Sequence, residues 1–282
     1  ACIVCGSTGW SALYEGLERC ASCGFVRARE LPTNEALARL YGPSYFHGDE
    51  YADYLGDRRV HVKNFRRRLD RITAVAGPLD SLYEIGCAYG FGLEAAKERG
   101  IRVAGIDISP EAVHHAAGTL ALDARLGAFE DVALEPGAFQ AFCMWDTLEH
   151  LARPEAFVAK IATLLPAGGW FFATTGDIGS SVAQRQQARW RMIHPPTHLQ
   201  YFSRDTLGRF LARHGLTAVH FESTPMSRSV FGTLEGLKRF DRGLLRSAAR
   251  VAQAIVPDAL TRRMHFSLDL GDIMLVCARK ER

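Results

Sequence analysis

Tyr83-Glu84-Ile85-Gly86-Cys87-Ala88-Tyr89-Gly90-Phe91-Gly92, continued by Ile106-Asp107, is the stretch of this chain that decides its fold. It reads as a strand, a glycine turn, a helix, a second strand and a terminal acid, which is the order that builds a nucleotide-binding crevice. The glycines allow a sharp turn and a close approach to a ligand. Asp107 ends the second strand, where a carboxylate can accept hydrogen bonds from two ribose hydroxyls.

The spacing of the glycines indicates the chemistry of the ligand. G-x-x-x-G-x-G is not the dinucleotide fingerprint G-x-G-x-x-G, so the pattern lacks a tight pyrophosphate cradle and favours a nucleoside without phosphates. The acidic Glu84 before the turn fits a cationic ligand better than a polyphosphate. S-adenosylmethionine meets both conditions, and the turn therefore predicts it as the ligand.

Several further segments resemble class I S-adenosylmethionine-dependent methyltransferases in the expected order. Residues 84–92 look like the first motif of that family, 105–109 like the second, 139–151 like the fourth strand and its turn, and 164–175 like the turn into the fifth strand. The resemblance implies an α/β fold, with a Rossmann-like seven-stranded, mostly parallel sheet whose last strand is antiparallel. One departure is Gln140, where the family often has Asp, and this side chain is expected to be structural.

The resemblance also implies which residues bind the cofactor. They come from the glycine turn, from the ends of the second and fourth strands, from the turn after a short third strand and from an aromatic loop at 41–54, and they are Tyr45, Glu84, Gly86, Tyr89, Gly90, Asp107, Ile108, Phe129, Glu130, Trp145 and Asp146. In related zinc-ribbon methyltransferases such a loop covers the cofactor, although ordinary packing of Tyr45 is an equal alternative. Phe129 would stack on the adenine, and Glu130 either flanks it or lies at a surface turn.

Length and composition agree with a globular enzyme. The chain has 282 residues, of which 48% are hydrophobic, enough for one full-sized core and a small accessory module. It shows no basic-then-apolar leader and no apolar run near the roughly 20 residues that a membrane span needs, so we expect a cytoplasmic protein. A net charge of +3 is too small to imply nucleic-acid binding by itself.

Four of the seven cysteines form two C-x-x-C pairs near the start of the chain. Cys2-x-x-Cys5 and Cys20-x-x-Cys23 have the spacing of a zinc ribbon, in which four thiolates make a tetrahedral site. Such a closed site leaves no position for substrate, so the predicted Zn²⁺ is structural. A redox C-x-x-C normally needs one pair, not two. The remaining cysteines are expected to be buried in or beside strands: Cys87, Cys143 and Cys277.

The order of the segments predicts three domains. They are a zinc ribbon at 1–29, a helical cap with the aromatic loop at 30–76, and a methyltransferase domain at 77–282 that carries a helical insertion at 225–270. From Ser81 the pattern alternates strand and helix, as a parallel sheet with helical crossovers requires. Strands are predicted near 81–86, 102–107, 139–145 and 169–175, with a final pair at 218–223 and 272–280.

Three histidines are candidates for a general base: His150, His194 and His198. His150 follows the fourth strand, and the other two lie in the segment 190–202, on the side where substrate would enter. A histidine near its free pKa accepts a proton at neutral pH, although a base is needed only if the acceptor does not lose its proton unaided. His150 has a structural alternative, because the Glu149-His150-Leu151 turn recurs in methyltransferases with different substrates.

The i, i+3, i+4 spacing of Asp146, Glu149 and His150 permits a different hypothesis. Their oxygens and nitrogen could bind a divalent metal, as in quinone O-methyltransferases that carry a similar stretch. The sequence shows no fourth ligand for such a site.

The predicted insertion at 225–270 is the most basic part of the chain. Its eight Lys and Arg and four Asp and Glu give a net charge of +4, more than the +3 of the whole chain. It could be a lid over an anionic substrate, such as a nucleotide-linked sugar or a carrier-bound acyl group. It could also be a helix that meets a membrane surface or a partner, or simply a solvated helical face.

Three functions are compatible with these features. We favour a small-molecule methyltransferase that acts on an O, N or C atom of a secondary metabolite or glycan precursor, because the ribbon, the aromatic loop and the Glu149-His150-Leu151 turn resemble zinc-ribbon sugar and tailoring methyltransferases. The long carboxy-terminal domain of sugar C-methyltransferases is not seen, which makes O- or N-methylation at least as expected. The alternative is a ribosomal RNA methyltransferase, against which the low basicity of the ribbon counts. The third is cofactor binding without catalysis. We expect a monomer or a homodimer.

Overall fold

Seven strands form the central sheet in the order β10-β13-β8-β7-β4-β5-β6. The computed structural model describes residues 1–33, 53–239, 247, 249–251, 253 and 256–281. The strands are β4 (Ser81–Ile85), β5 (Arg102–Asp107), β6 (Ala124–Leu126), β7 (Ala141–Trp145), β8 (Trp170–Gly176), β10 (Leu216–Ser223) and β13 (Ile273–Lys280). Only β13 runs antiparallel to its neighbours. The predicted fold class is confirmed, and the predicted strand bounds agree to within two residues.

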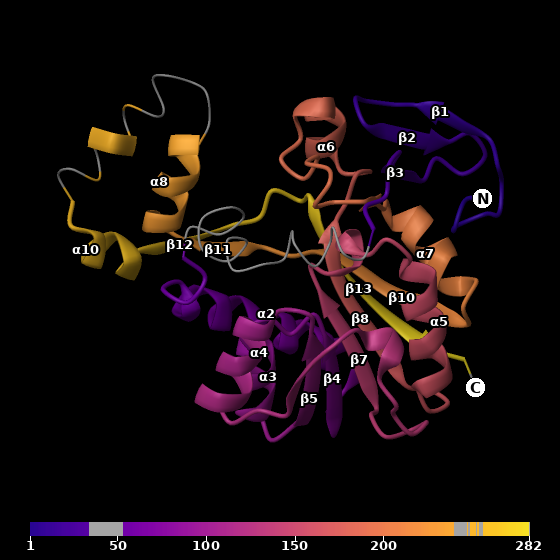
Figure 1. Ribbon diagram of the computed structural model, residues 1–282, viewed down its shortest axis with the longest axis horizontal. Coiled ribbons are helices and arrows are strands. Elements are labelled where there is room, and N and C mark those ends of the chain that lie inside the picture. The colour runs from indigo at the N-terminus through magenta and orange to yellow at the C-terminus, as the bar shows by residue number, and fades with distance from the viewer. Residues whose placement is uncertain (34–52, 240–246, 248, 252, 254–255, 282) are drawn as a thin grey trace.

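Helices cover both faces of this sheet (Figure 1). On one face lie α2 (Arg58–Ala76), α3 (Phe91–Lys97) and α4 (Pro110–His114, continued by η2, His115–Thr119), and on the other α5 (Pro154–Leu164) and α7 (Arg204–Ala212). Strand β7 shows why both layers are needed, because its alternate side chains face opposite sides. Phe142 and Met144 pack with residues of α5 and α7, whereas Cys143 and Trp145 pack with residues of α2 and α3.

The connections at the carboxyl ends of the strands contain short helical turns. They are η3 (Phe129–Asp131), η4 (Leu148–His150), α6 (Ser181–Gln186) and η5 (Gln187–Arg189). Helix α7 begins after Ser203, whose hydroxyl accepts from the backbone N–H of Thr206 and completes a capping box. The predicted structural role of Gln140 is also seen, since its Oε1 accepts from the backbone N–H of Asp80 at 2.8 Å.

The N-terminal segment forms a small sheet, the ribbon, which strand pairing joins to the rest of the protein. Strands β1 (Trp10–Ala12), β2 (Leu17–Cys20) and β3 (Val26–Ala28) pair with one another, and β3 pairs further with β9 (Gln200–Tyr201). The rings of Phe25 and Phe202 lie 4.9 Å apart in the shared core. The sequence did not predict β9, because a two-residue strand has no periodicity of its own.

The insertion before the last strand contains a hairpin as well as helices. It comprises β11 (Met226–Ser229), α8 (Val230–Arg239), α10 (Asp258–Arg263) and β12 (His265–Leu268), and it projects from the body in Figure 1. The prediction of a purely helical insertion is therefore wrong for β11 and β12. The buried amide of Asn64 on α2 explains the first of these strands, because it bonds both the N–H and the C=O of Ser227. Within the described ranges, no helix has the length and apolarity needed to cross a membrane.

Candidate functional site

The glycine turn after β4 brings the backbone close to surrounding side chains. Gly86 has a φ of +78°, and a Cβ there would lie 2.5 Å from Oγ1 of Thr147. A Cβ on Gly92 would lie 2.5 Å from Oε2 of Glu84. Side chains at these two positions would therefore collide with the residues that form the site, which is the physical reason for glycine at both.

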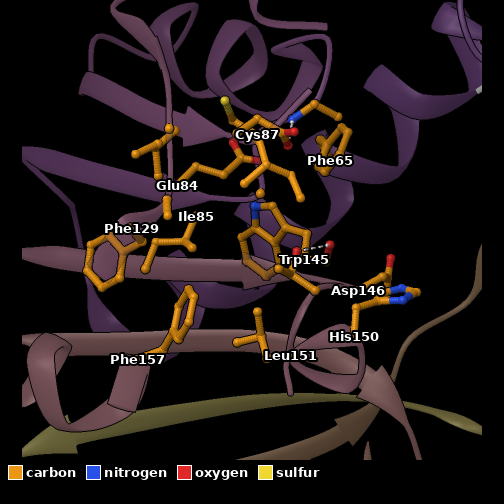
Figure 2. Close-up of a pocket in the computed structure, with 18 of the residues that line it drawn as sticks. Phe65, Glu84, Ile85, Cys87, Phe129, Trp145, Asp146, His150, Leu151 and Phe157 are labelled. Carbon is orange, nitrogen blue, oxygen red and sulfur yellow. Dashed lines mark hydrogen bonds between the residues drawn. The ribbon is translucent and has the colours of Figure 1, made fainter. Parts of the chain in front are cut away.

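A first cavity of about 410 Å³ lies at the carboxyl ends of β4, β5 and β7. Eight of the predicted cofactor residues line it: Glu84, Gly86, Asp107, Ile108, Phe129, Glu130, Trp145 and Asp146. Figure 2 shows Phe129 and Phe157 at one end, Asp146 and His150 at the other, and Trp145 between them. The cavity thus has an aromatic end and a polar end, as a ligand with a flat base and a charged tail requires.

Glu84 and Asp107 place two carboxyl groups beside this cavity. Glu84 is buried, and its Oε2 has no hydrogen-bond partner within the described part of the chain. Burial raises the pKa of Glu84 to about 8, because an ionised carboxylate loses its hydration there. Asp107 accepts from the backbone N–H groups of Ala88 at 2.8 Å and Ser109 at 2.9 Å. An unpaired buried acid beside a glycine turn fits a cationic group, and Asp107 has lone pairs left for hydroxyls.

Asp146 is held by an ion pair with a buried arginine. Nη2 of Arg68, a side chain that is 4% exposed, donates to Oδ2 of Asp146 at 2.6 Å, and the hydroxyl of Thr174 donates to Oδ1 at 2.8 Å. Asp146 also has a φ of +51°, an uncommon backbone conformation that redirects the chain after β7. Both carboxylate oxygens therefore accept a hydrogen bond. In the described part of the chain, the candidate metal ligands that lie together here are Glu149, His150 and His198, so His198 takes the place of Asp146 in the metal hypothesis.

A second cavity of about 200 Å³ adjoins the first. The two share five lining residues: His61, Asn64, Asp146, His150 and Met226. Its other walls come from Arg191 and His198 on one side and from Ser227 and Ser229 of β11 on the other. The cavity is thus assembled from α2, the insertion and the segment before β9.

Glu149, His150 and His198 converge at this second cavity, each offering one ligand atom, and the three atoms lie within 4.8 Å of one another. Nδ1 of His150 donates to the carbonyl of Thr197 and Nδ1 of His198 to that of Met192, both at 2.8 Å. These bonds orient both rings and place the unprotonated nitrogen of each neutral ring at Nε2.

Burial keeps all three of these groups uncharged at neutral pH. It lowers the pKa of His150 to about 4 and that of His198 well below its usual range, because a charged imidazole would lose its hydration. Burial, with the nearby charge of Asp146 as the next cause, raises the pKa of Glu149 to about 8. The rings of His150 and His198 are therefore unprotonated at neutral pH and can accept a proton or a cation, but the lowered pKa makes both weaker bases than a free histidine. Asp146 does not belong to this group.

Three of the predicted site residues lie elsewhere in the structure, and Tyr45 lies outside the described residues. Tyr89 is buried, and its hydroxyl donates to Glu111 at 2.8 Å. Gly90 supplies the left-handed residue that begins α3, so it supports the turn. His194 contacts the ring of His198 at a centroid distance of 3.9 Å but lines neither cavity.

Helix α2 contributes three residues to the site that the sequence patterns did not predict. His61, Asn64 and Arg68 repeat at spacings of three and four, so they share one helix face, and all three line the first cavity. This face also holds the apolar residues Phe65 and Leu69. Polar residues on an otherwise apolar helix face were the signal that could have found them.

The cysteine pairs of the ribbon come together as expected for a metal site. Cys2 Sγ lies 3.5 Å from Cys23 Sγ, and Cys5 Sγ lies 3.6 Å from Cys20 Sγ. All four sulfurs lie within 4.8 Å of one another, and none is in a disulfide. Tetrahedral zinc with bonds of about 2.3 Å would separate sulfurs by about 3.8 Å, so the cluster fits that ion. The other three cysteines are buried, as predicted.

Comparison with known proteins agrees with this geometry. A family model described as a methyltransferase domain matches residues 54–221. The chain belongs to this methyltransferase family. Family and fold make it a class I S-adenosylmethionine-dependent methyltransferase.

Relatives of this methyltransferase include ubiquinone biosynthesis O-methyltransferases. That of Chromobacterium violaceum is 35% identical over 113 residues, which cover 38% of this chain and 48% of the relative. That of Burkholderia pseudomallei is 35% identical over 157 residues, or 51% of this chain and 68% of the relative. The chain thus spans about half the length of the first of these relatives. A Thermotoga maritima methyltransferase structure matches 80% of this chain and 91% of its own at 14% identity and a TM-score of 0.52, which shows the shared fold.

Proposed function

We propose that this methyltransferase moves the methyl group of S-adenosylmethionine to a hydroxyl oxygen of a small-molecule acceptor. The observation that carries the proposal is the junction of two cavities, one beside the acidic glycine turn and one beside neutral histidines. The names of the O-methyltransferase relatives favour oxygen over nitrogen or carbon.

The first cavity is the proposed donor site. Glu84 would bind the cationic part of the cofactor, and its carboxyl would ionise there, because a nearby positive charge lowers a carboxyl pKa. Asp107 would accept from the ribose hydroxyls, and Phe129 would pack on the base at the aromatic end. When bound, the cofactor supplies an electrophilic methyl group on a sulfonium.

The second cavity is the proposed acceptor site. Holding the hydroxyl in line with the methyl group supplies much of the rate enhancement of such a transfer. When the acceptor oxygen takes up the methyl group, its hydroxyl proton would pass to Nε2 of His150, which the Nδ1 bond to Thr197 leaves unprotonated. Glu149, which is uncharged at neutral pH, would lie beside the resulting imidazolium, and His198 would orient the acceptor.

The ribbon is proposed to hold a structural Zn²⁺. Cys2, Cys5, Cys20 and Cys23 offer four thiolates, and a closed four-thiolate site stabilises a small fold and takes no part in catalysis. A metal analysis of the purified protein should find about one zinc per chain. Prolonged chelation that removes a different metal and abolishes turnover, while this zinc is retained, would instead assign a cation to Glu149, His150 and His198.

The test is a transfer assay with tritium in the methyl group of S-adenosylmethionine. Purified protein is offered a panel of hydroxylated small molecules, including catechols, hydroxybenzoates and sugars, and separately total RNA. We expect the label to enter a small molecule as an ether that resists mild base. The Asp107→Ala variant should transfer no label. Label in RNA alone, or in neither pool, would contradict the proposal.

A further inference from the structure

Among the residues that the structure describes, strand β12 is paired along only one of its edges. It belongs to a two-stranded sheet with β11, in which Met226 pairs with Leu268, Ser227 with Ser267, Arg228 with Phe266 and Ser229 with His265. All four residues of β12 are exposed. Natural edge strands are usually protected by lysine, proline, a bulge or a covering element, and none of these protects β12 among the described residues.

The hydrogen bonds of β11 show which backbone groups point outward. The N–H and C=O of Ser227 face away from β12, because both bond to the side chain of Asn64. Ser227 and Ser267 are therefore a non-hydrogen-bonded pair of the antiparallel ladder, and the backbone groups of Ser267 also point away from the hairpin. The backbone N–H and C=O of His265, two residues earlier, also point away from the hairpin. The backbone carbonyl of Met264 points toward the chain that follows β11 instead, since it accepts from the backbone N–H of Val230 at 2.9 Å.

The side chains around this edge are unusually apolar for a surface. Leu260, Met264, Phe266, Leu268 and Leu270 are 41–52% exposed, and they make up half of the large exposed hydrophobic residues of the described chain. Met264, Phe266 and Leu268 alternate along the strand and so lie on one face. An apolar stripe beside an open strand edge is the combination from which strand-mediated association arises.

This edge is complementary to itself in one register. If two copies of β12 pair antiparallel about a twofold axis at Phe266, His265 lies opposite Ser267 of the other copy, and their outward backbone groups bond reciprocally. Met264 then faces Leu268, so the apolar stripe becomes continuous, and Phe266 meets its own copy. The exposed charges at the two ends, Arg263 and Asp269, also lie opposite each other.

We propose that the protein is a homodimer in which the β12 edges of two copies join the β11–β12 hairpins into one four-stranded sheet. The isologous contact satisfies the twofold symmetry of most homodimers, since each residue and its partner exchange places. Strand β11 of the same hairpin lines the second cavity through Ser227 and Ser229. The dimer contact therefore supports a wall of the proposed acceptor site, although the proposal does not depend on the function given to that site.

Cross-linking tests both the contact and its register. Opposite residues of a non-hydrogen-bonded pair have Cα atoms about 4.5 Å apart, within the range of a disulfide. The Phe266→Cys variant should form a disulfide-linked dimer under mild oxidation. The Leu126→Cys variant is the matched control, because Leu126 is 56% exposed on the far edge of the central sheet and should remain uncross-linked. Equal yields from the two variants would overturn the proposal.

Sedimentation analysis of the unmodified chain tests the association itself. The chain should sediment as a dimer, and Phe266→Lys should raise the dimer dissociation constant at least about tenfold, whereas Leu126→Lys should not. Thermal unfolding of both variants shows whether the fold is retained. A monomer at all concentrations would overturn the proposal, and a monomer that binds phosphatidylglycerol vesicles through Phe266 would assign the same edge to a lipid surface instead.

Discussion

The two cavities of this methyltransferase are built in different ways. In the first, the two carboxylates proposed to bind the cofactor, Glu84 and Asp107, come from consecutive elements, β4 and β5, and are only 23 residues apart in the chain, although the lining as a whole runs from Tyr54 to Met226. The second draws its walls from α2, η4, the segment before β9 and the insertion, and its residues run from Asp57 to Ile273. The carboxylates of the proposed donor site are thus placed by local structure, whereas the proposed acceptor site depends on long-range packing throughout.

The largest expected effect is on the rate of methyl transfer, and it distinguishes the acceptor cavity from the donor cavity. His150→Gln removes the proposed proton acceptor and should lower kcat by about 10² to 10⁴-fold, with little change in cofactor affinity. Steady-state kinetics with the acceptor found by the transfer assay measures this. The control is His194→Gln, because His194 lines neither cavity. Equal losses in the two variants would argue against His150 as the base.

The next effect is on the donor side. Asp107→Ala removes a carboxylate that is proposed to accept from two hydroxyls, and each bond to a charged group contributes about 1.5–3 kcal/mol. The affinity for S-adenosylmethionine should fall by about 10²-fold or more. Calorimetric titration measures it, with the exposed Asp123→Ala as control. Unchanged affinity in Asp107→Ala would refute the position of the donor site.

Loss of the proposed ribbon Zn²⁺ should damage the acceptor side selectively. Two backbone hydrogen bonds connect the ribbon to that side. The N–H of Ala28 donates to the carbonyl of Leu199 at 2.8 Å, and the N–H of Leu199 donates to the carbonyl of Glu149 at 2.7 Å. Cys20→Ser should lower the free energy of unfolding by several kcal/mol and expose the segment 187–198 to proteolysis. Cofactor affinity should change by less than about threefold. Intact resistance to protease would disprove this coupling.

A smaller effect concerns stability without cofactor. The pKa of Glu84 is raised from 4.5 to about 8, so its contribution to stability is present below pH 4.5 and is lost as the pH rises to about 8. The Glu84→Gln variant has no carboxyl group to ionise, so it does not lose this stability as the pH rises. The variant should therefore gain a few degrees in Tm over the parent near pH 8, and the gain should shrink toward zero near pH 4. A Tm difference that is constant with pH would contradict the buried, protonated state.

The same contrast explains how far the sequence could predict the structure. Local patterns predicted β4, the turn, β5 and the four ribbon cysteines, because spacing alone places those groups. Arg68 could not be predicted as the partner of Asp146, since the two meet only after α2 packs on the sheet. The hairpin of β11 and β12 was missed for a similar reason, because Asn64 of a distant helix stabilises it.

The most direct test compares the two cavities through the cofactor alone. The dissociation constant of S-adenosylmethionine is measured by calorimetric titration for the parent chain, for Glu84→Gln and for His198→Gln at neutral pH. If Glu84 binds the cationic part of the cofactor and His198 belongs only to the acceptor side, the first variant should bind at least about tenfold more weakly and the second within about twofold of the parent. Weaker cofactor binding by His198→Gln, together with unchanged cofactor binding by Glu84→Gln, would contradict the division of the site into these two cavities.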